Sequence, residues 1–73
     1  MHNSGMNVKL LVARKQLEMT QDDLAEKAGI PQADISRIES RGWIPPKDIQ
    51  ERLATALATT PDELFAQGAD IAS

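Results

Sequence analysis

The chain has 73 residues, which is the length of one small domain with a marginal hydrophobic core. Its formal net charge of −3 argues at first against nucleic acid as a partner, and the absence of cysteine excludes disulfide bonds and thiolate metal sites. The only histidine, His2, lies in a polar leader, and no apolar run approaches the roughly 18 residues of a membrane span, so we expect a cytoplasmic protein without metal or cofactor.

Apolar spacing and capping residues predict the first two helices. Leu10, Ala13 and Leu17 fall on one helical face, so a first helix is expected to follow Asn7 and to end near Leu17. Thr20 is expected to start a second helix, because its hydroxyl accepts a hydrogen bond from a backbone N–H in the first turn. The apolar face and glycine stop expected for this helix are Leu24, Ala25, Ala28 and Gly29.

A third helix is expected to start at Pro31 or Gln32 and to end at Gly42, with Ile35 and Ile38 pointing inward. A turn of about three residues that contains glycine joins it to the second helix, which is the helix-turn-helix signature. Such a short turn makes the two helices cross steeply. One helix is then able to lie over a phosphate strand while the other enters the major groove of DNA.

Two more helices complete the predicted fold. The fourth runs from about Pro46 or Lys47 to Leu57, and the fifth is capped by Thr60, with Glu63 expected to complete a capping box. The apolar positions expected to be buried here are Ile49, Leu53, Ala56, Leu57, Leu64 and Phe65. Without strand alternation, repeats or linkers, the prediction is one all-α bundle: a flexible leader at 1–6, a helix-turn-helix domain at 7–66 and a frayed tail at 67–73.

The charges are unevenly distributed along the chain. Residues 1–21 carry a net charge of +2 and residues 30–47 a net charge of +1, whereas residues 48–73 carry −4. A surface formed by residues 1–21 and 30–47 can therefore carry a net positive charge. We do not expect an enzyme or a catalytic residue, because the acidic pairs Asp22–Asp23 and Asp62–Glu63 fall in first helical turns, where the helix dipole explains them.

The segment TQDDLAEKAGIPQADISRIESRG, residues 20–42, resembles the phage-repressor and Cro-like helix-turn-helix family, often called xenobiotic-response-element regulators. The resemblance extends over nearly the whole chain, at Arg14, Met19, Thr20, Gln21, Leu24, Ala25, Gly29, Ile30, Ile35, Ser36, Ile38, Glu39, Pro45, Leu53, Ala54 and Leu57. It implies a compact five-helix, lambda-repressor-like fold and a sequence-specific DNA-binding regulator of transcription.

In this family, the glutamine after the cap of the second helix holds a DNA phosphate and braces a glutamine that opens the recognition helix. The resemblance places these roles on Gln21 and Gln32. A glutamine amide both donates and accepts, and so matches adenine N6 and N7, while a helix N-terminus attracts an anion. The alternative is that both are solvated surface glutamines. The resemblance to the family favours DNA contact.

The further candidate DNA contacts are Ala33, Ser36, Arg37, Ser40, Arg41 and Lys47. Ala33 is able to touch a thymine methyl, and Arg41 and Lys47 are placed like the phosphate-contacting loop residues of the family. Two interpretations of Arg37 stay open. Its guanidinium contacts guanine or a phosphate, or its charge is solvated or paired within the protein.

The resemblance also implies an architectural salt bridge between Arg14 and Glu39, which would tie the first helix to the end of the third. Trp43 is the only tryptophan. Its side chain has three possible roles: it covers the core, donates its indole N–H to a phosphate, or contacts a partner subunit. Packing on the core is favoured.

By resemblance, the regulator would bind as a homodimer to a pseudo-palindromic operator with half-sites about one helical turn apart, and would repress by occluding polymerase. Family dimers often use the fifth helix and its flanking loop, here residues 58–65, with Leu64 and Phe65 as the candidate interface. The alternative is an antitoxin or protein-interaction module, which would use the same fold and the acidic C-terminal end to bind a toxin or an antirepressor.

Overall fold

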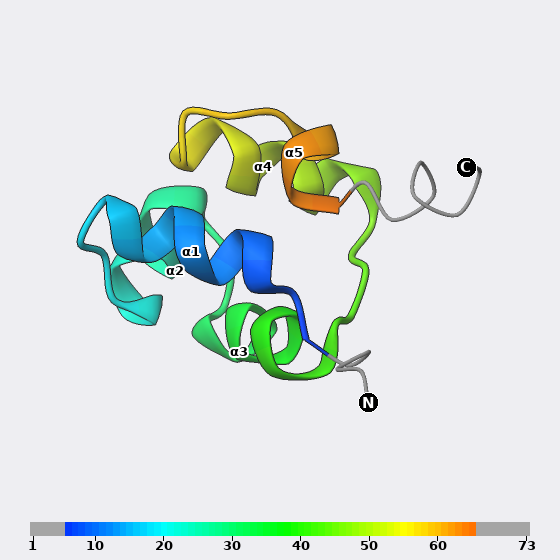
Figure 1. Ribbon diagram of the computed structural model, residues 1–73, viewed down its shortest axis with the longest axis horizontal. Helices are drawn as coiled ribbons and strands as arrows, with labels where there is room; N and C mark the ends of the chain where they lie inside the picture. The colour runs from blue at the N-terminus through cyan, green and yellow to red at the C-terminus, as the bar shows by residue number, and fades with distance from the viewer. Residues whose placement is uncertain (1–5, 66–73) are drawn as a thin grey trace.

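Five helices follow one another in residues 6–65, the part of the chain that the computed structural model describes (Figure 1). They are α1 (Val8–Gln16), α2 (Gln21–Ala28), α3 (Gln32–Arg41), α4 (Lys47–Ala56) and α5 (Pro61–Phe65). No strand occurs among these residues, and the predicted all-α class is confirmed. The tail predicted at 67–73, and all of the predicted leader except Met6, lie outside the described residues. No helix of residues 6–65 has the length and apolar character of a membrane span.

The helix caps differ in completeness between α2 and α5. At α2 the Thr20 hydroxyl accepts from the Asp23 N–H and the Asp23 carboxylate accepts from the Thr20 N–H, both at 3.0 Å, which closes a capping box. At α5 the Thr60 hydroxyl accepts from the Glu63 N–H at 3.3 Å, but the return bond is absent from the described contacts. The capping box predicted at Glu63 is therefore wrong, since only one of its two hydrogen bonds forms.

Both ends of α3 are set by glycines with left-handed backbone. Gly29 ends α2 at a φ of 73°, and Gly42 ends α3 at a φ of 70°. Between Gly29 and α3, Ile30 is buried and Pro31 takes an extended conformation at the N-cap position, one residue earlier than a first helical position. The three-residue turn 29–31 thus reverses the chain and starts α3 at a fixed angle to α2.

The core lies between all five helices. Its buried apolar side chains are Leu10, Leu24, Ala25, Ala28, Ile30, Ile35, Ile38, Leu53, Ala54, Ala56, Leu57 and Leu64. The expectation that Leu17 faces inward is wrong, because its side chain is 48% exposed. Leu17 lies one residue beyond the last residue of α1, where the inward-facing stripe of the helix no longer continues. Ile49 and Phe65 are only partly buried and pack against the edge of the core.

Replacing Gly29 by alanine is expected to lower the free energy of unfolding by about 1–2 kcal/mol, because an L side chain is strained in the left-handed conformation. The added Cβ would lie 3.2 Å from Arg52 Nη1, the flexible end of a side chain that is able to move aside. Urea denaturation measures the difference. Lys27→Ala, on the exposed side of α2, is the control and should change stability by less than about 0.5 kcal/mol. An unchanged Gly29→Ala midpoint would contradict this account of the turn.

Candidate nucleic-acid interface

The helix α3 turns one face to the core and the opposite face to solvent. Ile35, Ile38 and Glu39 are buried, and the other face carries exposed residues. Of the α3 residues suggested by the sequence as DNA contacts, Ser36 is half-buried, and the exposed ones are Gln32, Ala33, Arg37, Ser40 and Arg41. The helix α3 lies along one edge of the molecule (Figure 1), so its exposed residues have access to a DNA groove.

A buried ion pair connects α1 to α3. The Arg14 guanidinium donates from Nε to Glu39 Oε2 at 2.7 Å and from Nη2 to Glu39 Oε1 at 3.0 Å, and the two residues are 7% and 5% exposed. A third donor, Nη1, reaches the Met19 carbonyl oxygen at 2.7 Å. The hydrogen bond to Glu39 raises the pKa of Arg14 against the opposing effect of burial, so Arg14 stays charged in the folded protein.

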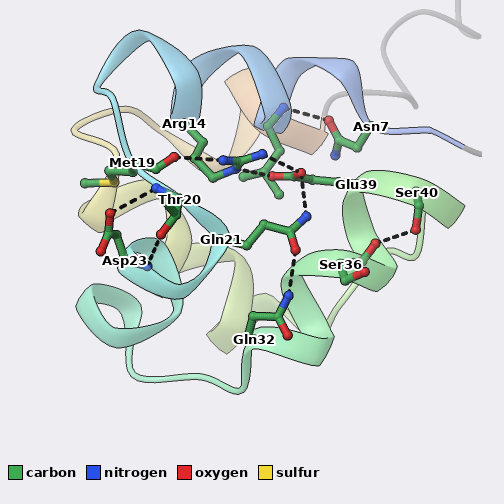
Figure 2. A network of polar contacts seen from close by, with 11 residues as sticks. Asn7, Arg14, Met19, Thr20, Gln21, Asp23, Gln32, Ser36, Glu39 and Ser40 are labelled. Atoms are coloured by element: carbon green, nitrogen blue, oxygen red, sulfur yellow. Dashed lines mark hydrogen bonds and ion pairs between the residues drawn. The ribbon is translucent and has the colours of Figure 1, made fainter.

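Two glutamines extend this ion pair to the surface (Figure 2). Gln21 Nε2 donates to Glu39 Oε1 at 3.0 Å, and Gln32 Nε2 donates to Gln21 Oε1 at 2.6 Å. The order of donors is dictated by chemistry, since an ionised carboxylate only accepts. Glu39 must therefore face the NH₂ group of Gln21, whose oxygen then faces the NH₂ group of Gln32. The carboxylate thus fixes which way round both amides lie.

An open hollow lies at the start of α2, beside Gln32. Its lining consists of Arg14, Lys15, Glu18, Met19, Thr20, Gln21, Asp22 and Gln32. The capping box uses the N–H groups of Thr20 and Asp23, while those of Gln21 and Asp22 find no acceptor among the described residues. A helix N-terminus with unused N–H groups favours an anion, although Glu18 and Asp22 oppose one here.

The loop 42–46 carries two exposed cations at its ends. Arg41 is the last residue of α3, Lys47 is the first of α4, and neither forms an ion pair with a described residue. Between them the loop is held to the fold, because Pro45 is buried and its carbonyl accepts from Gln50 Nε2 at 2.9 Å. The Arg41 and Lys47 side chains therefore stand at the two ends of a supported loop.

Trp43 lies in the same loop and is partly buried against the core, so the packing role predicted for it is confirmed. The guanidinium of Arg37 lies over its ring, with Cζ 4.9 Å from the ring centroid. This contact is within the range of a cation–π interaction. Sequence spacing did not reveal it, because Trp43 lies past the end of the helix that carries Arg37.

The structure does not support the roles suggested by the sequence for two side chains, Ser40 and Leu64. The Ser40 hydroxyl donates to the Ser36 carbonyl oxygen at 2.6 Å, which leaves no proton for a phosphate oxygen. Leu64 is 2% exposed and belongs to the core, so its side chain cannot form the expected dimer contact. Phe65, its neighbour, is half-buried and also packs on the core. We therefore omit Ser40 and Leu64 from the proposed contacts.

Asn7 is a tie that sequence analysis recognised only in part. Its side chain caps α1 by accepting from the Leu10 N–H at 2.9 Å, as predicted. In addition, its Nδ2 donates to the Leu64 carbonyl at 3.0 Å and its backbone N–H donates to the Glu39 carbonyl at 3.2 Å. Asn7 therefore connects α1, α3 and α5. The carbonyl partners carry no sequence signal, so only the fold reveals this role.

A family model described as helix-turn-helix matches residues 10–64, from the first turn of α1 to the penultimate residue of α5. The match includes every residue of the network formed by Arg14, Gln21, Gln32 and Glu39. Comparisons with curated proteins and with solved structures gave no significant match.

Replacing Arg14 by methionine is expected to lower the free energy of unfolding by about 3–5 kcal/mol, because it leaves the Glu39 carboxylate buried without its cation. The double variant Arg14→Met/Glu39→Met should regain part of that loss, since no buried charge is then unpaired. Urea denaturation measures all three proteins.

The exposed pair between Arg52 and Asp48, at 3.4 Å, provides the matched control. Asp48→Ala should change stability by less than about 1 kcal/mol, because solvent screens an exposed pair. Equal losses for Arg14→Met and Asp48→Ala would show that the buried pair contributes no more than a surface one.

Proposed function

The chain belongs to the phage-repressor and Cro-like helix-turn-helix family and is a DNA-binding regulator, and we propose that it represses transcription as a homodimer on a pseudo-palindromic operator. The observation that carries the proposal is the hydrogen-bonded series from the buried Arg14–Glu39 pair through Gln21 to Gln32. It holds an exposed amide at the N-terminal end of α3, where a recognition helix meets base edges.

Gln32 is the proposed base-contacting residue. Its bond to Gln21 uses one N–H, and its other N–H and its carbonyl oxygen stay available to DNA. One donor beside one acceptor complements N7 and N6 of adenine in the major groove. The amide is held in one orientation before binding, so less side-chain entropy is lost on contact than for a free glutamine. Ala33, exposed beside it, is proposed to touch a thymine methyl.

The proposed phosphate contacts flank this amide. One is the Gln21 N–H at the N-terminus of α2, and the others are Arg41 and Lys47, which flank the loop 42–46. The acidic residues Asp62 and Glu63 belong to α5, which lies at the opposite end of the molecule from α3 (Figure 1). This separation supports DNA binding at α3 despite the net charge of −3.

The proposed dimer contact uses a groove between α1 and α5. Leu64 forms its floor, and its rim carries two exposed valines of α1, Val8 and Val12, which are 49% and 45% exposed. Leu17, 48% exposed, extends the apolar rim. Apolar side chains gathered at one groove favour association, and the groove adjoins the residue range 58–65 that the family often uses. The contact thus moves from Leu64 itself to the rim above it.

Binding to DNA fragments selected from a random pool tests the base contact. Gln32→Ala should lower discrimination at one adenine position by about 10- to 100-fold, the effect of losing a bidentate contact. Lys47→Ala should instead weaken binding to all sequences alike and reduce the salt dependence by about one phosphate contact. Lys27→Ala removes the same charge from a side of α2 that faces α4 and should do neither. Absence of sequence-selective binding by the wild type at low salt would refute the proposal.

Sedimentation at several protein concentrations tests the dimer. Val12→Asp puts a charge on the apolar rim, so this variant should be more monomeric than the wild type. It should also weaken binding to operators with two half-sites more than binding to single half-sites. Thr55→Asp, an exposed site on α4, adds the same charge elsewhere. Unchanged sedimentation of Val12→Asp would exclude this groove. A stoichiometric partner protein without self-association would favour the antitoxin alternative.

A further inference from the structure

Arg37 and Trp43 form a contact that the proposed function does not use. Arg37 is exposed on α3, and its guanidinium carbon lies 4.9 Å from the centroid of the Trp43 ring. Trp43 is partly buried against the core, so the ring is a supported surface. A cation over an indole face within about 6 Å is attracted by the ring quadrupole.

The backbone conformation after α3 places the Trp43 ring next to Arg37. Gly42 takes a left-handed conformation and its N–H donates to the Ile38 carbonyl at 3.0 Å. The next N–H, that of Trp43, donates to the Arg37 carbonyl at 3.5 Å. Such a closure folds the chain back over the last turn of the helix. The residue that carries the ring is therefore bonded through its backbone to the residue that carries the guanidinium.

A ring holds an arginine differently from a carboxylate. A carboxylate neutralises the guanidinium and occupies its N–H groups, whereas an aromatic face restrains it and leaves both its charge and its donors in place. Asp34, three residues before Arg37 on the same helix, is spaced to compete for it. The ion pairs among the described residues are Arg14–Glu39 and Arg52–Asp48, so Asp34 does not neutralise Arg37.

The position of Arg37 points to the DNA backbone as its target. At about 100° per residue, Arg37 lies about 140° around α3 from Gln32, on the flank of the exposed face. The ring holds it toward the loop 42–46, whose ends carry the exposed cations Arg41 and Lys47. Arg37 and Arg41 lie about one turn apart on the same side of α3, and such a pair of cations suits a row of phosphates rather than a base edge.

We propose that Trp43 is a positioning residue that holds the Arg37 guanidinium ready for a DNA phosphate, an inference that rests on the proposed function of α3. The ring restricts a long side chain before binding, so the complex loses less side-chain entropy when the phosphate contact forms. Trp43 thus contributes to DNA affinity through Arg37, without itself contacting DNA.

A double-mutant cycle tests this role. The wild type, Trp43→Leu, Arg37→Ala and the double variant are titrated with the selected operator at several salt concentrations. Arg37→Ala should reduce the slope of log affinity against log salt by about 0.9, the value for one phosphate contact, equally for operator and random DNA. Trp43→Leu should weaken binding by about two- to fivefold when Arg37 is present, and by less than about 1.5-fold in the Arg37→Ala background.

Control measurements separate positioning from packing. Thermal unfolding establishes that each variant is folded at the assay temperature, and Trp43→Phe, which keeps a weaker aromatic face, replaces Trp43→Leu if that variant is not folded. Trp43→Phe should weaken binding less than Trp43→Leu. Lys27→Ala, which also removes one cation, should leave the salt slope unchanged.

The outcomes distinguish the inference from the proposed function. Selective binding by the wild type with additive effects of the two substitutions would overturn the inference alone, because Trp43 would then act independently of Arg37. A change of base preference in Arg37→Ala with an unchanged salt slope would overturn the phosphate assignment. A wild type without selective DNA binding would contradict the proposed function itself. Coupling together with the reduced salt slope would establish the positioning role.

Discussion

The burial of one ion pair is the constraint on which the rest of this fold depends. Arg14 and Glu39 lose nearly all contact with water, which is costly for two charges, and the loss is offset only by close, fully used hydrogen bonds. The guanidinium meets this condition with two bonds to the carboxylate and one to the Met19 carbonyl. These bonds connect α1, the chain entering α2, and the end of α3. Asn7 reinforces the same junction by donating to the Glu39 carbonyl.

The same pair connects the core of the fold to the proposed base contact. Because the Glu39 carboxylate only accepts, it orients Gln21, and Gln21 in turn orients Gln32 at the surface. The proposed base-contacting amide is thus held by a buried charge two residues away in the network. A substitution in the core of the fold is therefore able to change DNA selectivity without any contact with DNA. A surface glutamine that lacked this support would have to be ordered at the moment of binding.

Backbone conformation supplies the second constraint, because α3 lies between two left-handed glycines. Gly29 sets where α3 begins relative to α2, and Gly42 sets where the chain turns back after it. The first turn produces the helix-turn-helix crossing, and the second brings Trp43 under Arg37. Both glycines were recognisable as helix stops in the sequence. The contacts that these glycines create were not recognisable in the sequence, because each contact depends on which side chains the chain meets after the turn.

The sequence by itself determined the all-α class, the helix-turn-helix and its caps, because these depend on hydrophobic period, on Thr20 and on two glycines that act within a few residues. The family resemblance added the glutamine and ion-pair positions. Only the tertiary structure decided which side chains remain free. Leu17 was expected inside and lies at the surface, whereas Leu64, expected both to dock on the core and to form an interface, lies in the core. A helical period predicts a face, but burial depends on what packs against that face, and this is settled when all five helices meet.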